Sequence, residues 1–357
     1  MAYTTIDNPS EFFSTTLYTG DGSADQSMTG AGFKPDFLWI KRRNASERHV
    51  LTNVAMGVDS GAYKWVDAAA LEGAFSGGTG VASFDSDGFT IKTSDSTWNT
   101  NGSTYVFWSW KANGGTTATN NDGSLASTVQ ANTTAGISIV TYSNPSTNDN
   151  TIGHGLGVQP EIIIIKNTVD TIDWWVASKY LTNYTTSYVE LNSDDPVATH
   201  ANGMNSTAPT SSVFSVGGIS RTGDSGNLAV AYCFASIQGY SKIGSYIGNG
   251  NARGPFVWTG FKPAWVMVKP YTNSGYNWVI MDSTRNPFNP IDKYTWADLD
   301  NAEYDGTSIG LDVDFVSNGF KLSTSRGEVN LNGATMLYMA FAENPFVSSG
   351  GIPTTAR

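Results

Sequence analysis

The chain has 357 residues, a formal net charge of −11 and a charged fraction of only 14%. This acidic balance lacks the basic patch that nucleic-acid binding requires and opposes attraction to anionic membranes, so neither partner is expected. The single cysteine, Cys233, excludes an intrachain disulfide, and no apolar run approaches the length of a membrane-spanning helix.

Residues 1–15 come before any repeated pattern. They contain MAYTTIDNPSEFF, which lacks the basic and apolar regions of a signal peptide. Without a signal or a cysteine framework, the chain suits assembly in a reducing cytoplasm. Because they lie outside the repeats, we interpret residues 1–15 as an N-terminal attachment segment.

A ten-residue pattern then occurs three times. It reads GFKPDFLWIK at residues 32–41, GVQPEIIIIK at 157–166 and GFKPAWVMVK at 260–269. The spacing of about 100 to 125 residues is too long for a solenoid repeat and indicates copied domains. Other residues keep the same order around each copy: Tyr18, Tyr142 and Tyr246 before it, and Phe84, Phe214, Phe315, Gly102, Gly226, Gly333, Trp110, Phe234 and Phe341 after it.

The strand after each proline is predicted to be buried on both faces. In the first copy, Phe37 and Trp39 alternate with Leu38 and Ile40, and the other two copies also have two apolar faces. Proline suits the start of such a strand, and we expect the lysine at its end to lie in solvent. Strands of this kind need cover on both sides, so we expect extensive contact between copies or with other subunits, and hence a homo-oligomer.

These patterns predict an all-β chain of three tandem antiparallel β-sandwich repeats of about 100 residues each, with minor helix. Residues 113–136 are rich in Gly, Thr, Asn and Ser and are interpreted as a linker, with an edge strand allowed in LASTVQ. Short helices are expected within residues 66–75 and 297–305. The predicted boundaries are 16–112 for repeat 1, 137–236 for repeat 2, 237–346 for repeat 3 and 347–357 for a C-terminal tail, a second candidate for attachment.

No catalytic, cofactor-binding or metal-binding residue is predicted. His49, His154 and His200 have no metal-ligand spacing. The string GDSG at residues 223–226 resembles the surroundings of a serine nucleophile, but no histidine and aspartate context supports it. Cys233 aligns with small residues and is interpreted as a buried apolar side chain.

Acidic turns leave calcium binding open. Pairs of aspartates on turns supply the oxygens that calcium prefers, although aspartate beside glycine more often caps backbone groups. Paired carboxylates for glycoside hydrolysis also stay open, because their separation is spatial. The acidic pairs are Asp85 and Asp87, Asp194 and Asp195, and Asp312 and Asp314.

Aromatic residues are the remaining candidates for ligand contact. The chain has 11 tryptophans and 16 tyrosines, most of which fit the predicted core faces. An exposed ring beside asparagine or aspartate would suit stacking on the apolar face of a sugar. Four tryptophans have no clear place in the core: Trp98, Trp174, Trp258 and Trp296.

Several segments resemble a family of virion structural proteins from tailed phages of marine bacteria, cyanophages among them. The resemblance lies in the opening IDNPSEFFSTTLYTGDG, the junction YSKIGSYIGNGN, the strand GFKPAWVMVK and the ending MAFAENPF…GIPTTAR, and it covers nearly the whole chain. Members are described as structural, tail-fibre or lectin-like sandwich proteins. The resemblance implies a non-enzymatic protein of the virion that is assembled in the host cytoplasm, and it carries no catalytic residue.

Three functions follow as hypotheses. The first is a tail fibre, appendage or adhesin subunit that contacts other virion proteins and a glycan of the host surface. The second is a capsid decoration or head-fibre protein whose three repeats mimic a trimer. The third is a module that binds or cleaves polysaccharide. Location in the particle separates the first two, and release of reducing ends from host polysaccharide would support the third.

Overall fold

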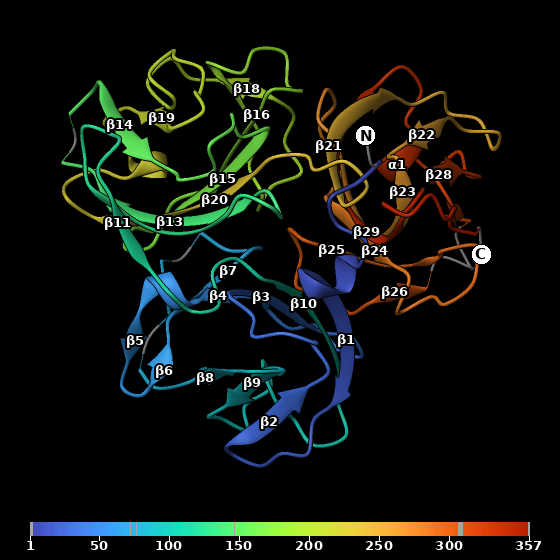
Figure 1. The fold of residues 1–357 in the computed structure, drawn as a ribbon, viewed down its shortest axis with the longest axis horizontal. Helices are drawn as coiled ribbons and strands as arrows, with labels where there is room; N and C mark the ends of the chain where they lie inside the picture. The colour runs from blue at the N-terminus through green and yellow to red at the C-terminus, as the bar shows by residue number, and fades with distance from the viewer. Residues whose placement is uncertain (1–2, 72, 76, 146, 306–309, 356–357) are drawn as a thin grey trace.

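The computed structural model describes residues 3–71, 73–75, 77–145, 147–305 and 310–355. They form an almost entirely β structure of antiparallel sheets, which confirms the all-β, sandwich-like class with minor helix. Three lobes surround a common centre (Figure 1). We call residues 13–112 the first lobe, 118–234 the second and 241–345 the third. No helix among the described residues is long and apolar enough to cross a membrane.

Each lobe pairs one large sheet with smaller strands. The first lobe has the sheet β1 (Phe13–Thr19), β10 (Thr104–Trp110), β3 (Phe37–Arg42), β4 (His49–Asn53), β7 (Trp65–Asp67), the sheet β2 (Gln26–Thr29), β9 (Gly88–Ile91), β8 (Val81–Asp85), and the pair β5 (Val58–Asp59), β6 (Ala62–Tyr63). The second has β11 (Ala118–Asn120), β12 (Ser127–Asn132), β13 (Ile137–Ser143), β20 (Leu228–Phe234), β15 (Ile162–Asn167), β16 (Trp175–Ser178), and the pairs β14 (Asn150–Gly153), β19 (Val213–Val216) and β17 (Ser187–Tyr188), β18 (Ala198–Thr199). The third has β21 (Ser241–Ile247), β29 (Thr335–Pro345), β23 (Phe261–Pro270), β24 (Val279–Asp282), β25 (Lys293–Trp296), β26 (Tyr304–Asp305), and the sheet β22 (Phe256–Trp258), β28 (Gly319–Leu322), β27 (Val313–Val316). The helical turns are η1 (Pro9–Glu11), η2 (Val54–Met56), η3 (Ser220–Thr222) and α1 (Gly327–Asn330).

The strands that follow the three prolines occupy equivalent places. In each large sheet this strand lies between the strand that carries the later aromatic residue and the next strand along the chain. The central strands are β3, β15 and β23, and their neighbours are β10 and β4, β20 and β16, and β29 and β24.

The two apolar faces of these strands contribute to different cores. Phe37 and Trp39 face a central core shared by all three lobes, whereas Leu38 and Ile40 face an outer core inside the first lobe. The expected burial on both faces is confirmed, and the cover comes from this chain itself. The other lobes divide alike, with Ile162, Ile164, Trp265 and Met267 in the central core and Ile163, Ile165, Val266 and Val268 in the outer cores.

Three sequence expectations need correction. Residues 113–136, interpreted as a linker, contain β11 and β12, which extend the second large sheet through hydrogen bonds to β13. The two expected helices are wrong, because Asp67 and Asp298 accept hydrogen bonds from the backbone of a neighbouring strand and do not cap a helical turn.

The terminal segments are packed against the body of the protein. Ile6 is buried in the central core, and the β1 strand already begins at Phe13, inside the proposed attachment segment 1–15. The backbone N–H of Ser349, in the tail, donates to Asp7 Oδ1 at 2.6 Å. Residues 1–15 therefore contribute to the fold, and their removal would uncover part of the core.

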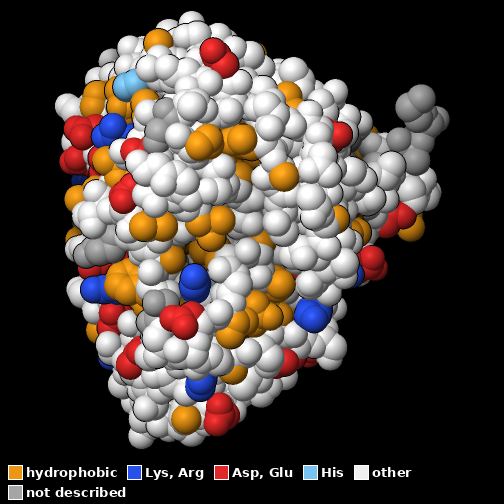
Figure 2. All heavy atoms as spheres, turned by 90° about the vertical axis from the view of Figure 1, so that its left-hand side faces the viewer, with side chains coloured by type: hydrophobic (Ala, Val, Ile, Leu, Met, Phe, Trp, Pro, Cys, Tyr) orange, Lys and Arg blue, Asp and Glu red, His pale blue; other side chains and the backbone are white. Residues whose placement is uncertain are grey.

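The surface matches the low charged fraction. Figure 2 shows the face at the left of Figure 1, where acidic and basic side chains are scattered among uncharged polar atoms and the hydrophobic side chains form small groups. Most of the apolar surface of the chain is thus used in the four cores.

We predict that Trp110→Ala destabilises all three lobes together. The Trp110 ring lies 4.9 Å from Phe37 in its own lobe, 6.5 Å from Phe234 in the second and 5.9 Å from Trp265 in the third, measured between ring centroids. Truncation of a buried tryptophan costs about 3–5 kcal/mol. Urea unfolding should show one transition at lower urea, and hydrogen exchange should accelerate in β3, β15 and β23 alike.

Trp258→Ala is the control for this change, because Trp258 is half-exposed and outside the cores, so its unfolding midpoint should stay near that of the parent. Separate transitions for the lobes, or faster exchange in the first lobe alone, would contradict a shared central core.

Candidate functional site

The lysine at the end of each ten-residue pattern is buried, which corrects the expectation that it lies in solvent. Each ammonium donates to two backbone carbonyls, one in the loop after its own strand and one in a neighbouring lobe. The acceptors are Glu47 and Asp300 for Lys41, Ile172 and Leu71 for Lys166, and Tyr276 and Ser193 for Lys269.

These contacts join the lobes in a closed ring. Lys41 links the first lobe to the third at 2.8 Å, Lys166 links the second to the first at 2.7 Å, and Lys269 links the third to the second at 2.8 Å, each distance from Nζ to the carbonyl oxygen. A buried ammonium needs hydrogen-bond acceptors, so each lysine fixes how two lobes meet. We call these three contacts the lysine latches.

A ring lies beside each latch. In the second and third lobes it is a tryptophan whose indole N–H also crosses to the neighbouring lobe, from Trp174 to the carbonyl of Asp67 at 3.0 Å and from Trp278 to that of Glu190 at 2.8 Å. In the first lobe it is His49, whose Nδ1 accepts a hydrogen bond from Trp39 Nε1 at 2.9 Å. Burial and the nearby Lys41 charge hold the pKa of His49 well below its usual range.

The backbone N–H of each ring residue donates to a short polar side chain on the next segment of its lobe. The acceptors are Asp67 for His49, Asn192 for Trp174 and Asp298 for Trp278. Burial raises the pKa of Asp67 and of Asp298 to about 7. Two of the three equivalent sites therefore hold a carboxyl group that titrates near neutrality, while Asn192 carries no charge.

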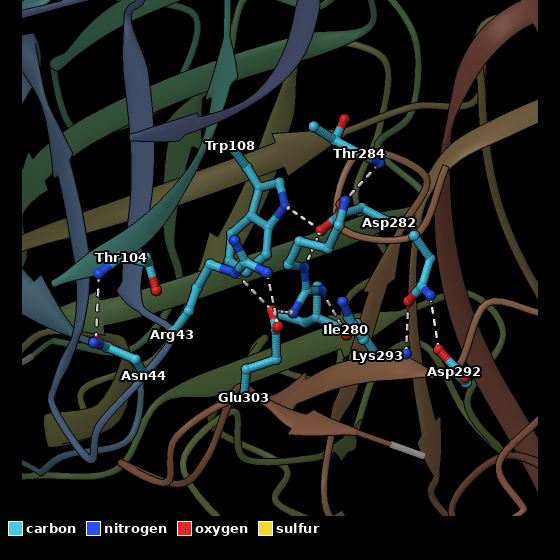
Figure 3. A network of polar contacts seen from close by, with 12 residues as sticks. Arg43, Asn44, Thr104, Trp108, Ile280, Asp282, Thr284, Asp292, Lys293 and Glu303 are labelled. Atoms are coloured by element: carbon cyan, nitrogen blue, oxygen red, sulfur yellow. Dashed lines mark hydrogen bonds and ion pairs between the residues drawn. The ribbon is translucent and has the colours of Figure 1, made fainter. Parts of the chain in front are cut away.

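The junction of the first and third lobes also holds a network of ion pairs (Figure 3). The Arg43 guanidinium donates two hydrogen bonds of 2.9 Å to the Glu303 carboxylate, and Trp108 Nε1 donates to Asp282 Oδ2 at 3.1 Å. Fully buried Arg285 lies between the two carboxylates, 2.5 Å from Asp282 and 3.2 Å from Glu303. These charges are paired with one another, so the network acts as a structural joint.

The other candidate residues have structural places. Cys233 is fully buried in the outer core of the second lobe, and burial raises the pKa of its thiol. His154 Nδ1 accepts from the Leu156 backbone, and His200 Nδ1 accepts from the Asn202 backbone. In the string GDSG, Asp224 Oδ2 accepts from Ser220 Oγ at 2.8 Å.

The acidic turns mostly bind their own loops. Asp87 accepts from the N–H groups of Gly30 and Gly32, and Asp85 accepts from two hydroxyls on its own hairpin. Within the described ranges, no three His, Cys, Asp or Glu side chains are grouped closely enough to hold a metal ion.

The four unassigned tryptophans separate clearly. Trp98 and Trp174 are fully buried, and Trp296 is half-buried against Tyr294. Trp258 is 50% exposed, so it alone of the four presents a free ring face. Sequence reasoning named it among four, and its place on the short outer strand β22 is what exposes it.

Trp258 lies in a cleft of about 390 Å³ where the N-terminal segment meets the third lobe. Phe346 supports its ring edge-on, with centroids 5.5 Å apart, and Tyr3 Oη donates to the Gly260 carbonyl at 2.8 Å. A side chain at position 260 would meet the Tyr3 hydroxyl, so glycine keeps the floor open. The cleft is lined by Tyr3, Ser236, Gln238, Ser241, Lys242, Trp258, Thr259 and Gly260.

An aromatic platform beside amide, hydroxyl and ammonium groups can bind a sugar. The ring covers the apolar C–H face, and the polar side chains bond the hydroxyl rim. Lys242 adds a positive charge, and among the described residues it has no ion-pair partner. The geometry therefore favours an acidic or neutral saccharide.

Comparison with known families gives one match. A family described as "Domain of unknown function (DUF7483)" matches residues 8–345. No curated protein and no solved structure matches the chain.

We predict that Asp67→Asn raises the unfolding free energy at pH 8 and not at pH 4. The folded pKa of about 7 exceeds the ordinary value of 3.8, so the folded state binds this proton more tightly and stability falls as pH rises from about 4 to about 7. Asparagine removes the buried charge and keeps an oxygen for the His49 N–H, as Asn192 does for Trp174. The gain should be about 1–3 kcal/mol, after the lost attraction to Lys41 is subtracted.

Urea unfolding at pH 4, 6 and 8 measures this effect, with Asp25→Asn on an exposed loop as the control. Parallel pH profiles for Asp67→Asn and the parent would show that Asp67 is charged at no cost.

Proposed function

The chain belongs to this family of domains of unknown function, and we propose that it is a non-enzymatic structural protein of a tailed-phage virion, a tail fibre or appendage subunit that contacts the host surface. The observation that carries the proposal is the ring of three equivalent sheets closed by the lysine latches. The sequence resemblance to virion structural proteins supplies the setting.

A closed ring suits a mechanical role. The lobes share one core, so no lobe can rotate without exposing aromatic side chains of the others. The buried ammonium groups add specific polar contacts at all three junctions, and breaking one leaves a charge without its acceptors. An appendage that transmits contact from a host surface to a particle needs this kind of rigidity.

A capsid decoration protein is the second candidate, and the arrangement of the lobes favours it. Three equivalent sheets around one axis present a quasi-threefold surface from a single chain, which fits a local threefold position on a shell. A trimeric partner in a tail offers the same symmetry, so location in the particle distinguishes the two candidates.

The Trp258 cleft supports the host-contact part of the proposal. It combines an exposed indole with Gln238, Lys242 and Ser236, and these groups match the hydroxyl-rich, often acidic sugars of bacterial surfaces. The cleft is formed where the N-terminal segment packs on the third lobe, so its shape depends on the folded terminus.

The first test locates the chain in purified virions of a phage that encodes it. A density map of the particle should show the three-lobed shape at the tail, in few copies. Many copies at threefold positions of the shell would establish the decoration role, and absence from the virion would contradict both.

We predict that Trp258→Ala weakens binding to host-surface polysaccharide at least about tenfold, equivalent to about 1.4 kcal/mol, because the stacking platform is lost. Glycan-array or calorimetric titration with the purified chain measures the change. Trp258→Phe should retain part of the affinity. Phe288→Ala, which removes an equally exposed ring outside the cleft, should bind like the parent. Equal binding by Trp258→Ala would exclude the cleft as the glycan site.

A further inference from the structure

Three equivalent strands lie toward one end of the large sheets, but their outer edges differ. The residues opposite the later aromatic of each lobe set the equivalence: Phe13 pairs with Trp110 in β1, Ile137 with Phe234 in β13, and Ser241 with Phe341 in β21. The outer edge of β13 is covered by β12, which pairs with it antiparallel from Ser127–Tyr142 to Asn132–Ile137.

The edge of β21 is blunted by its own chain. Ile237 forms a bridge with Ser241, and the N–H of Ile243 donates to Ser236 Oγ at 3.0 Å. The strand also carries Lys242, and a lysine on an edge discourages pairing with another chain. Neither a partner strand nor a protective charge is needed beyond these.

The edge of β1 has neither form of cover among the residues that the structure describes. Lys111 N–H donates to the Phe12 carbonyl and Gly20 N–H donates to the Ser103 carbonyl, so the even-numbered residues of β1 bond to β10. In an antiparallel ladder, the alternate residues Phe13, Thr15 and Leu17 then direct their N–H and C=O groups outward. Their sequence context, FSTTLYT, has no charge and no proline to blunt the edge.

A cleft of about 440 Å³ runs beside this edge, between the first and third lobes. It is lined in part by Phe13, Thr15 and Ala264, and by Thr284, whose hydroxyl reaches the Thr15 carbonyl at 3.5 Å. The Thr15 hydroxyl is buried and has no hydrogen-bond partner within the described part of the chain. The cleft thus contains outward backbone groups and an unsatisfied hydroxyl.

The same place at the junction of the second and first lobes is filled. Here β12 and β13 contact η2, which follows β4. Ser283 and Thr284 follow β24, the equivalent of β4, and they form the matching wall of the cleft. The chain itself therefore shows what occupies this position when it is filled: an extended, uncharged strand with the sequence STVQAN.

We propose that the open edge of β1 accepts an extended strand from a partner chain, antiparallel to β1, in the position that β12 occupies on β13. The strand is uncharged and rich in small and hydroxyl-bearing residues, because Ala264 stands where Asp36 meets Gln130 of β12 and Glu343 is already paired with Lys262. Main-chain hydrogen bonds to Phe13, Thr15 and Leu17 provide affinity, and the cleft selects side-chain size. This proposal does not depend on the virion setting.

The test uses a synthetic peptide with the sequence of residues 124–134 and the full chain. At millimolar peptide, amide exchange at Phe13, Thr15 and Leu17 should slow about tenfold or more, while the amides of Ser14 and Thr16, already bonded to β10, should not change. Protection that is equal on β21, or no protection on β1, would overturn the proposal.

Leu17→Pro supplies the decisive variant, with Ser245→Pro as its matched control. Leu17 N–H points outward, so proline removes a donor for the partner and no bond to β10. Ser245 is the equivalent residue of β21. Leu17→Pro should abolish the protection, and Ser245→Pro should keep it. Unchanged protection in Leu17→Pro would refute strand addition, and should that variant fail to fold, the residue-by-residue protection pattern in the parent chain decides the question.

Discussion

Each large sheet contains a central strand that is apolar on both faces, and its need for cover on both sides determines the arrangement of the whole chain. The smaller strands of the same lobe cover the outer face. The inner face of the first lobe carries Phe37, Trp39, Trp108 and Trp110, and exposing four such side chains would cost about 10 kcal/mol. That is comparable with the entire stability of a domain, so the lobes hold one another folded.

The polar contacts at the junctions follow from this closure. When three sheets meet around one core, the ends of their central strands come together, and the lysine after each strand is drawn out of water. Backbone carbonyls of two lobes replace its hydration. Because Asp67, Asn192 and Asp298 fill equivalent positions with different charges, the junctions share a geometry but not a pH response.

The sequence predicted the features that depend on local pattern. The apolar alternation around Trp39, Ile164 and Met267 was enough to predict strands buried on both faces, and the small neighbours of Cys233 were enough to predict its burial. Composition misled at residues 113–136, because Ser, Thr and Asn suit a strand at the margin of a sheet as well as a linker. The buried latches could not be foreseen, since a lysine at the end of a strand is exposed unless another lobe supplies acceptors.

The positions where the lobes differ are the ones available for interaction. At the centre the three lobes must fit one another, so equivalent residues have equivalent roles there. At the margins that constraint is absent: β13 is covered by β12, β21 is blunted by Ser236 and Lys242, and β1 is left open beside a cleft. Trp258 likewise depends on the N-terminal segment, which has no counterpart in the other lobes. The shared core therefore explains stability, and the departures from equivalence at its margins are where recognition of other molecules is concentrated.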